Sequence, residues 1–257
     1  MEIRTIKKMK NDKYKISLDD ESFIVYGDVI VNNNLLYKKQ IDISLYEKIK
    51  EDNIYYEVYN KTLSFVLKKV RSKKEVDEFL KKFSIKDNLK KMIKDHLINI
   101  GLLSDIAYIK SYISDAIYIN LDGPYKIKNF LLSNELDIND IDSEIKLIDS
   151  EIILNNLRRL INKKINHNHK LSLKQLHQKI RYEMNMRGYS FVDIDMVLSE
   201  FDLTNEEEIL NKEFEKIYSK LSKKYTGQDL KNKVKQKLYI KGFQLDKINL
   251  LLEKKED

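Results

Sequence analysis

The feature that most restricts the fold is an internal repeat in the C-terminal part of the sequence. Two stretches match at a constant offset of 54 residues, and the apolar positions within each are mostly three or four residues apart. This spacing is typical of one face of an α-helix. A register of this kind indicates a repeat protein, in which similar modules pack against their neighbours. The matched pairs are Leu176 with Leu230, Ile180 with Val234, Met184 with Leu238, Gly188 with Gly242, Tyr189 with Phe243, Ile194 with Ile248 and Leu198 with Leu252.

The same helical spacing of apolar side chains runs back along the chain to Ile41. Equivalent mid-helix positions occur at Leu80, Leu131, Met184 and Leu238, at intervals of 51, 53 and 54 residues. Each module holds three apolar stripes, so each is predicted to contain three helices. In the first module the stripes are Leu63, Val66, Leu67 and Val70; Val76, Phe79, Leu80 and Phe83; and Leu89, Ile93, Leu97 and Ile100. We therefore expect a mainly all-α fold of tandem three-helix repeats in an elongated, curved array, with repeats at residues 41–103, 104–150, 151–204 and 205–257.

The first 40 residues follow a different pattern. Tyr14, Ile16 and Leu18 alternate with polar residues, residues 19–22 have the composition of a turn, and the apolar run 23–26 follows. Alternation with a period of two is typical of a β-strand with one buried face. We predict a small β-hairpin or meander in an N-terminal extension at residues 1–40.

Composition supports helices and narrows the class of protein. Proline occurs once and glycine six times in 257 residues, and charged residues make up 35% of the chain, which favours long helices over a loop-rich sandwich or a glycine-rich nucleotide-binding fold. Cysteine is absent, so disulfides and thiolate metal sites are excluded and a reducing compartment is expected. The sequence shows neither an export signal nor a membrane-spanning run of about 18 apolar residues. We expect a cytoplasmic protein that does not enter the membrane.

Short motifs mark where the predicted helices begin and end. Ser72 and Glu75 have the spacing of a capping box, in which each side chain bonds the backbone amide of the other residue. Pro124 follows Gly123 at a position where a missing amide hydrogen costs a helix nothing. Gly188 and Gly242 lie where helices are predicted to end, because glycine readily adopts the left-handed conformation of a C-terminal cap.

The residue types that carry catalysis do not occur in recognisable arrangements. None of the four histidines belongs to a His-Glu-x-x-His motif, and no two glycines have the spacing of a phosphate-binding loop. His167 and His169 could hold a metal weakly, but a solvated loop is the better interpretation because a stable site needs a third or fourth ligand. Acidic pairs such as Asp140 and Asp142 are interpreted as partners of helix N-termini. We therefore predict a binding protein with no catalytic residue, cofactor or metal.

Charge gives the main indication of a binding partner. The net charge is +7, from 48 basic and 41 acidic residues. Residues 61–102 carry 12 basic and 5 acidic groups, whereas residues 103–150 carry 4 and 9, which suits a polarised partner better than a uniform polyanion. For any single cation, a solvated helix face is the competing interpretation. The candidate partner-binding residues are Arg71, Lys73, Lys74, Lys81, Arg158, Arg159, Lys163, Lys164, Arg181 and Arg187, with Tyr118, Tyr125 and Tyr189 as candidate aromatic anchors.

An ordered set of motifs resembles the RecX family of recombination regulators. The resemblance covers residues from about 60 to 253, and the strand-like segment before them is similar to the extension of longer members. One departure is Asn134-Glu135-Leu136, which stands where the later repeats have Arg-Gly-Tyr and Lys-Gly-Phe. The motifs are Arg71-Ser72-Lys73-Lys74-Glu75-Val76 with Phe79-Leu80; Leu102-Leu103-Ser104-Asp105 with Ala107-Tyr108; Asp122-Gly123-Pro124 with Ile127 and Leu131; and Lys237-Leu238 with Lys241-Gly242-Phe243.

This resemblance implies a protein that binds the filament of the RecA recombinase. It would restrain filament extension, ATP hydrolysis and strand exchange, and so act in DNA repair, homologous recombination and the SOS response. We expect it to be a monomer. Two other classes remain open: a helical-repeat protein that binds single- or double-stranded DNA directly, and a scaffold for another protein. The acidic second repeat disfavours direct DNA binding because it repels phosphate, whereas the basic segment 158–187 favours it.

Overall fold

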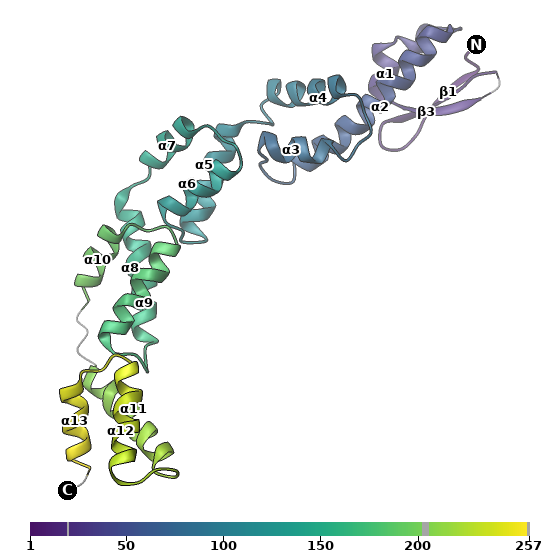
Figure 1. Ribbon diagram of the computed structural model, residues 1–257. Coiled ribbons are helices and arrows are strands. Elements are labelled where there is room, and N and C mark those ends of the chain that lie inside the picture. The colour runs from purple at the N-terminus through teal and green to yellow at the C-terminus, as the bar shows by residue number, and fades with distance from the viewer. Residues whose placement is uncertain (20, 202–205, 256–257) are drawn as a thin grey trace. The chain divides into compact units, whose positions relative to one another are not determined.

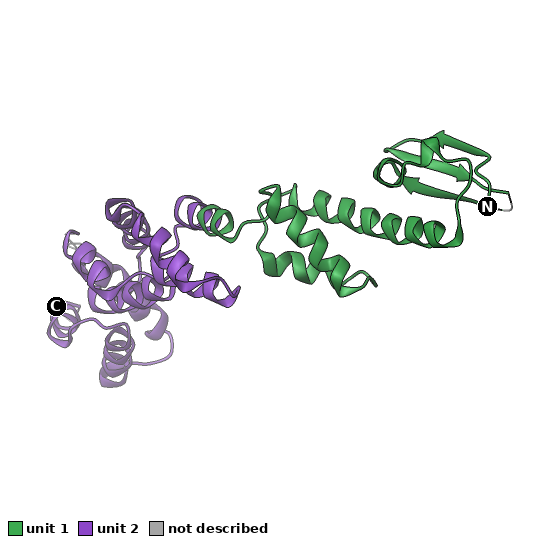
Figure 2. Cartoon of the chain, turned by 90° about the horizontal axis from the view of Figure 1, so that it is seen from above, with its two compact units in different colours: residues 1–111 green, residues 112–257 purple. Residues whose placement is uncertain are grey.

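The structure, a computed structural model, describes residues 1–19, 21–201 and 206–255. Asp20 of the predicted turn, the predicted repeat boundary between residues 204 and 205, and the last two residues of the fourth predicted repeat lie outside the described residues. The chain forms two compact units, residues 1–111 and residues 112–257 (Figure 2).

The first unit begins with an antiparallel sheet. Strands β1 (Thr5–Lys8), β2 (Lys13–Ser17) and β3 (Ser22–Tyr26) pair in the order β1-β2-β3. Ile16 lies opposite Phe23 and Tyr14 lies opposite Val25, so the alternating apolar side chains share one face. That face packs against helix α1 (Gly27–Asn32), the 3-10 helix η1 (Leu35–Tyr37) and the beginning of the next helix. The predicted meander is confirmed, whereas the sequence pattern did not indicate α1 and η1.

Twelve further helices follow within the described residues, as four consecutive triplets (Figure 1). The predicted fold class of tandem three-helix repeats is confirmed, and the residue boundaries of the repeats stay a prediction. The first triplet is α2 (Ile43–Val66), α3 (Lys73–Leu80) and α4 (Asp87–Asn99); the second is α5 (Asp105–Tyr118), α6 (Pro124–Ser133) and α7 (Ile138–Lys146); the third is α8 (Ser150–Asn166), α9 (Leu173–Met186) and α10 (Phe191–Ser199); the fourth is α11 (Glu206–Leu221), α12 (Gly227–Ile240) and α13 (Leu245–Glu253).

The offset of 54 residues corresponds to equivalent core positions in the last two triplets. Ile180 and Val234 both have no exposed surface, and the same holds for Ile194 and Ile248. The third and fourth triplets each enclose a separate apolar core. Each of these two triplets therefore buries its own set of apolar stripes, as expected for a repeat protein.

Helix α2 departs from the predicted stripe. Leu67 and Val70 were expected in the core, but they are 63% and 43% exposed because the helix ends at Val66. The helix instead extends over 24 residues and contributes to two cores. Ile49 packs with the sheet, whereas Val58 packs with α3 and α4. One long helix therefore connects the N-terminal extension to the first triplet within the first unit.

In the third and fourth triplets, the turn between the second and third helices uses a left-handed residue, as predicted for Gly188 and Gly242. Their φ angles are +91° and +82°. After Gly188, the amide of Tyr189 donates to the carbonyl of Met184 at 3.1 Å, and the amide of Gly188 itself donates to the carbonyl of Asn185 at 2.8 Å. This pair of hydrogen bonds satisfies carbonyls at the end of α9 in the manner of a Schellman cap.

The second triplet forms the same turn without glycine. Glu135 adopts a φ of +62°, and the amide of Leu136 donates to the carbonyl of Leu131 at 3.5 Å. The departure at Asn134-Glu135-Leu136 therefore keeps the turn geometry of the later triplets. A side chain in this backbone region costs roughly 1–2 kcal/mol relative to the right-handed conformation.

Candidate partner-binding surfaces

The predicted capping box at the start of α3 is present. The hydroxyl of Ser72 accepts from the amide of Glu75, and the carboxylate of Glu75 accepts from the amide of Ser72, both at 3.1 Å. Tyr108 of α5 is almost fully buried near this cap, and burial raises the pKa of its hydroxyl, with the nearby Glu75 carboxylate adding to the effect. These motif residues stabilise the first triplet and its junction with α5.

Two predicted cations beside this cap are engaged within the chain. The guanidinium of Arg71 lies 4.0 Å from the ring centroid of Phe65 and donates to Glu75 at 3.2 Å. Its side chain is only 16% exposed, so little of the charge is available to a partner. Lys73 forms an ion pair with Asp105 at 3.0 Å.

Two predicted cations of α8 are also paired. Arg158 donates two hydrogen bonds to Glu200, at 2.7 and 2.9 Å, and one to Glu151 at 2.7 Å. The hydrogen bonds from Arg158 hold the pKa of the Glu200 carboxyl below its ordinary value. Lys164 pairs with Glu183 at 2.6 Å.

An ion pair between the second and third helices recurs in two triplets. Lys128 of α6 pairs with Asp142 of α7 at 2.5 Å, and at the equivalent positions Arg181 of α9 pairs with Asp195 of α10 at 2.8 Å. Arg181 also lies 5.2 Å from the ring centroid of Phe191. The two carboxylates therefore bind cations on a neighbouring helix in addition to any interaction with their own helix.

Three predicted cations stay exposed. Lys81 lies at the end of α3, and Arg159 and Lys163 lie four residues apart on α8. None of the three has an ion-pair partner in the described part of the chain. Lys74, in the first turn of α3, does have a contact within the chain. Because residues four apart share one side of a helix, Arg159 and Lys163 present two charges in the same direction.

Two of the motif glycines meet at a junction between the second and third triplets. The amide of Gly123 donates to the carbonyl of Arg187 at 2.8 Å, and the amide of Tyr125 donates to the carbonyl of Gly188 at 3.0 Å. A Cβ atom on Gly123 would lie 2.3 Å from the carbonyl carbon of Gly188, and one on Gly188 would lie 2.3 Å from the amide nitrogen of Lys126. The two turns are in direct backbone contact, and Pro124 begins α6 at this point.

Polar side chains reinforce the same junction. The guanidinium of Arg187 donates to the carbonyl of Asn120 at 2.9 Å and lies 3.5 Å from the carboxylate of Asp122. The Asp122 side chain is 7% exposed and also accepts from Lys126 at 2.9 Å. Arg187 is therefore a residue of the junction between triplets.

A similar junction connects the third and fourth triplets. A Cβ atom on Gly242 would lie 2.5 Å from the hydroxyl oxygen of Ser172, and the amide of Ser172 donates to the carbonyl of Lys241 at 3.2 Å. Phe243, next to Gly242, is 2% exposed and belongs to the core of the fourth triplet. The motif at residues 241–243 thus contacts the third triplet through Lys241 and Gly242 and packs into the core of the fourth triplet through Phe243.

In two triplets, the first backbone amide of the second helix donates a hydrogen bond to a carboxylate at the start of the next triplet. The amide of Lys73 donates to Asp105 at 3.3 Å, and the amide of Leu173 donates to Glu206 at 3.2 Å. The acceptor in each case is the first residue of the following triplet. At the corresponding position, Pro124 has no amide hydrogen, so the second triplet leaves no such donor to be satisfied.

The candidate aromatic anchors fall into two groups. Tyr118 and Tyr125 are 64% and 62% exposed, so they remain available to a partner. Tyr189 is buried, and its hydroxyl donates to the carbonyl of Leu121 at 3.0 Å. Burial raises the pKa of Tyr189 to about 12. Tyr189 therefore packs within the junction.

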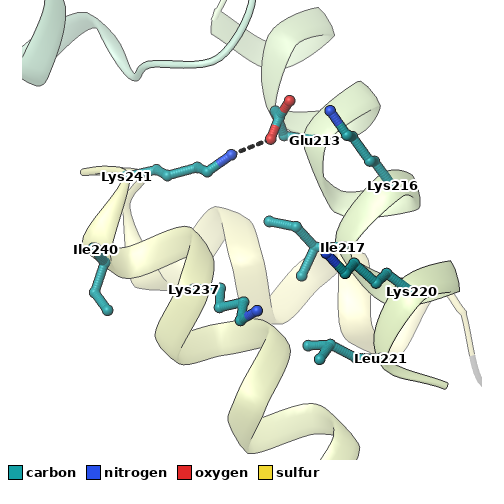
Figure 3. A pocket seen from close by; sticks show the side chains of 8 residues that line it. All are labelled: Glu213, Lys216, Ile217, Lys220, Leu221, Lys237, Ile240 and Lys241. Atoms are coloured by element: carbon teal, nitrogen blue, oxygen red, sulfur yellow. Dashed lines mark hydrogen bonds and ion pairs between the residues drawn. The ribbon is translucent and has the colours of Figure 1, made fainter. Parts of the chain in front are cut away.

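A groove between α11 and α12 contains lysines that were not among the candidate partner-binding residues predicted from the sequence (Figure 3). It has a volume of about 330 Å³. The carboxylate of Glu213 accepts from Lys241, and Lys216, Lys220 and Lys237 have no ion-pair partner among the residues described. The signal in the sequence is the four-residue spacing of lysines on each helix, although that spacing does not show that the two helices share a groove. The lining residues are Glu213, Lys216, Ile217, Lys220, Leu221, Lys237, Ile240 and Lys241.

Two further kinds of site are absent from residues 1–19, 21–201 and 206–255. In these ranges, no three histidine, aspartate or glutamate side chains are grouped so that they could hold a metal ion. No helix in the same ranges combines the length and the apolar character that crossing a bilayer requires.

The chain is similar to known proteins over almost its whole length. No protein-family model matches it. The regulatory protein RecX of Lactococcus lactis subsp. lactis (strain IL1403) is 30% identical over 97% of this chain and 96% of its own length. The regulatory protein RecX of Streptococcus agalactiae serotype III (strain NEM316) is 28% identical over 98% of each chain. A crystal structure of a regulatory protein RecX has the same fold, with a TM-score of 0.66 and 22% identity over 77% of this chain and 98% of the other.

Proposed function

Because the chain belongs to the RecX family, we propose that it binds the filament of the RecA recombinase and restrains filament extension, ATP hydrolysis and strand exchange. The relatives are regulatory proteins, and regulation of this kind is achieved by binding, with no need for a catalytic group. The protein acts where the recombinase and its DNA are, in the cytoplasm.

The observation that supports this proposal most directly is the repetition of the triplets. Four triplets follow one another, and the third and fourth share their core positions. A recombinase filament is likewise built from repeated units, its identical subunits. A chain with several similar surfaces can contact more than one subunit, and each contact after the first benefits from a raised effective concentration. Binding then depends on whether the subunits are assembled.

We propose the exposed cations Lys81, Arg159 and Lys163 as the first contacts with this partner. They need no rearrangement, because none has an ion-pair partner in the described residues. The other predicted cations would have to leave a contact within the chain, which offsets the free energy gained from the partner. These are Arg71, Lys73, Lys74, Arg158, Lys164, Arg181 and Arg187.

The test is ATP hydrolysis by RecA on single-stranded DNA. We expect the rate to fall when this protein is present at less than one molecule per RecA subunit, because one bound chain affects several assembled subunits. An unrelated DNA-dependent ATPase on the same DNA is the control and should keep its rate, which excludes simple masking of the DNA. Unchanged hydrolysis by RecA up to equimolar protein would rule the proposal out.

Direct binding to DNA is a second candidate, and the lysines between α11 and α12 favour it. The two candidates differ in their dependence on the recombinase. A protein that binds DNA by itself should show affinity for DNA alone, with a steep decrease as the salt concentration rises.

A further inference from the structure

The groove between α11 and α12 brings together lysines from two helices. Lys216 and Lys220 lie one turn apart on α11, whereas Lys237 lies in the last turn of α12 and Lys241 directly follows the end of that helix. Side chains four residues apart on a helix project to the same side. Figure 3 shows Lys220 and Lys237 extending into the space between the helices from opposite sides. The groove is therefore lined by a pair of lysines on each wall.

The acidic side chains of the groove do not balance these charges. Glu213 is the one carboxylate among its lining residues, and it is bound by Lys241. Lys216, Lys220 and Lys237 have no ion-pair partner among the described residues. Like charges that converge on one groove repel each other, so an anion in the groove is stabilised by all three.

The lysine rows extend beyond the lining residues. Lys233 lies one turn before Lys237 on α12, and Lys224 follows just after the end of α11. Neither has an ion-pair partner in the part of the chain that the structure describes. Regularly spaced cations along two helices match an anion that carries charges at regular intervals, and such an anion is a polymer.

The spacing of the lysines favours a phosphodiester chain over an acidic protein surface. Residues 188–257 contain no arginine, so the groove offers no planar guanidinium for bidentate hydrogen bonds to a carboxylate or a phosphate. Lysine acts as a point charge and binds a phosphate oxygen without a fixed orientation. A nucleic-acid strand carries one negative charge per nucleotide, whereas an acidic protein surface would need a cluster of aspartate and glutamate of matching spacing.

We propose that the groove between α11 and α12 binds the phosphodiester backbone of single-stranded DNA without reading its base sequence. This inference rests on the proposed function, because the protein would meet the DNA strand within the recombinase filament that it is proposed to bind. The apolar floor of Ile217 and Leu221 can contact the sugar of the strand, and the lysines around it neutralise consecutive phosphates.

The test uses the full chain and a short fluorescein-labelled oligothymidylate, without RecA, with fluorescence anisotropy measured at several salt concentrations. The variant carries Lys216→Gln, Lys220→Gln and Lys237→Gln. Its affinity at low salt should fall by about tenfold or more, and the slope of log affinity against log salt should decrease by about 2, because each phosphate contact on a single strand contributes about 0.7.

The matched control removes the same charge elsewhere, through Lys48→Gln, Lys91→Gln and Lys146→Gln. These lysines are exposed and have no ion-pair partner in the described residues, so this variant should keep most of its affinity. Circular dichroism checks that both variants keep their helical content. Equal affinity of the groove variant and the unmodified protein, or an equal loss in both variants, overturns the inference.

A third result would also overturn it. If the groove variant keeps its affinity for oligothymidylate but loses binding to RecA in the absence of DNA, the groove contacts acidic protein surface instead. The outcome is separable from that of the proposed function, because anisotropy with DNA alone does not involve the recombinase. A protein that fails to slow RecA but shows the expected salt slope would leave the inference in place and remove the proposed function.

Discussion

Tyr189 and Phe243 occupy equivalent positions in the third and fourth triplets, and they differ by one hydroxyl group. Both side chains are buried, at 1% and 2% exposure. The Tyr189 hydroxyl donates to the carbonyl of Leu121 in the second triplet, so it adds a hydrogen bond between triplets to the packing that both rings provide. Both rings belong to the core of their own triplet, and the hydroxyl group gives Tyr189 an additional contact with the neighbouring triplet.

We predict that Tyr189→Phe lowers the free energy of unfolding by about 1 kcal/mol near neutral pH, because it leaves the Leu121 carbonyl without its donor. The difference in the free energy of unfolding between the unmodified protein and this variant should shrink at high pH. The unfolded tyrosine loses its proton near pH 10, whereas Tyr189 in the folded protein keeps it up to about pH 12. The folded state therefore binds more protons in this window, and the unmodified protein loses up to about 1.4 kcal/mol per pH unit through this group.

The measurement for this prediction is urea unfolding of both proteins at about pH 8 and about pH 11. Every other titrating group is common to the two proteins, so the difference between them isolates Tyr189. A deficit that stays constant or grows with pH would show that the hydroxyl does not have the raised pKa.

At the scale of the elements, turns connect one triplet to the next. The turn after α9 and the turn before α6 are in contact through backbone atoms. Gly188 meets two demands there, since its φ of +91° favours glycine and the neighbouring chain leaves no space for a Cβ atom. Gly101, at the end of α4, meets only the first demand, because its φ is +74° and a Cβ atom at this position would have no neighbour within 4 Å.

This contrast gives a prediction for Gly188→Ala and Gly101→Ala. Both substitutions place alanine in the left-handed region, which costs about 1 kcal/mol. Gly188→Ala also forces its Cβ atom against Lys126, so it should lower the free energy of unfolding by at least about 3 kcal/mol. Denaturant unfolding of the two variants checks this, with Gly101→Ala as the control for the backbone conformation. Similar losses in both would mean that the two turns are not in contact.

At the scale of the whole molecule, charge pairing decides which surfaces can bind. The net charge is +7, but many of the cations have carboxylate partners within the chain. Among the described residues, exceptions include Arg159 and Lys163 on α8, and Lys216, Lys220 and Lys237 in the groove between α11 and α12. The surfaces available to an acidic partner are therefore narrower than the composition suggests.

We predict that Arg159→Gln combined with Lys163→Gln raises the concentration of this protein needed to halve ATP hydrolysis by RecA about three- to tenfold. Each exposed charge pair contributes about 0.2–1 kcal/mol, so the loss of two contacts should be measurable but partial. The control is Lys48→Gln with Lys91→Gln, which removes the same charge from exposed sites in the first unit. An unchanged potency of the Arg159 and Lys163 variant would exclude these residues as contacts.

The helices, the turns and the meander could be predicted from the sequence because the interactions behind them are local. The capping box joins Ser72 to Glu75, three residues away, and the left-handed cap at Gly188 depends on the preceding turn of its own helix. The apolar spacing also predicted the core, since water excludes a helical stripe of leucine and isoleucine whatever it packs against. The prediction was wrong for Leu67 and Val70, where no local signal marked the end of α2 at Val66.

The sequence alone therefore determined a chain of helical triplets with a small sheet before them, and the tertiary structure decided which charged residues are free. Arg158 and Glu200 are 42 residues apart, and only the packing of α8 against α10 brings them within hydrogen-bonding distance. Likewise, only the pairing of α11 with α12 turns two spaced sets of lysines into one groove. Burial of an apolar side chain needs any apolar neighbour, whereas the state of a charge depends on the particular carboxylate that the fold places beside it.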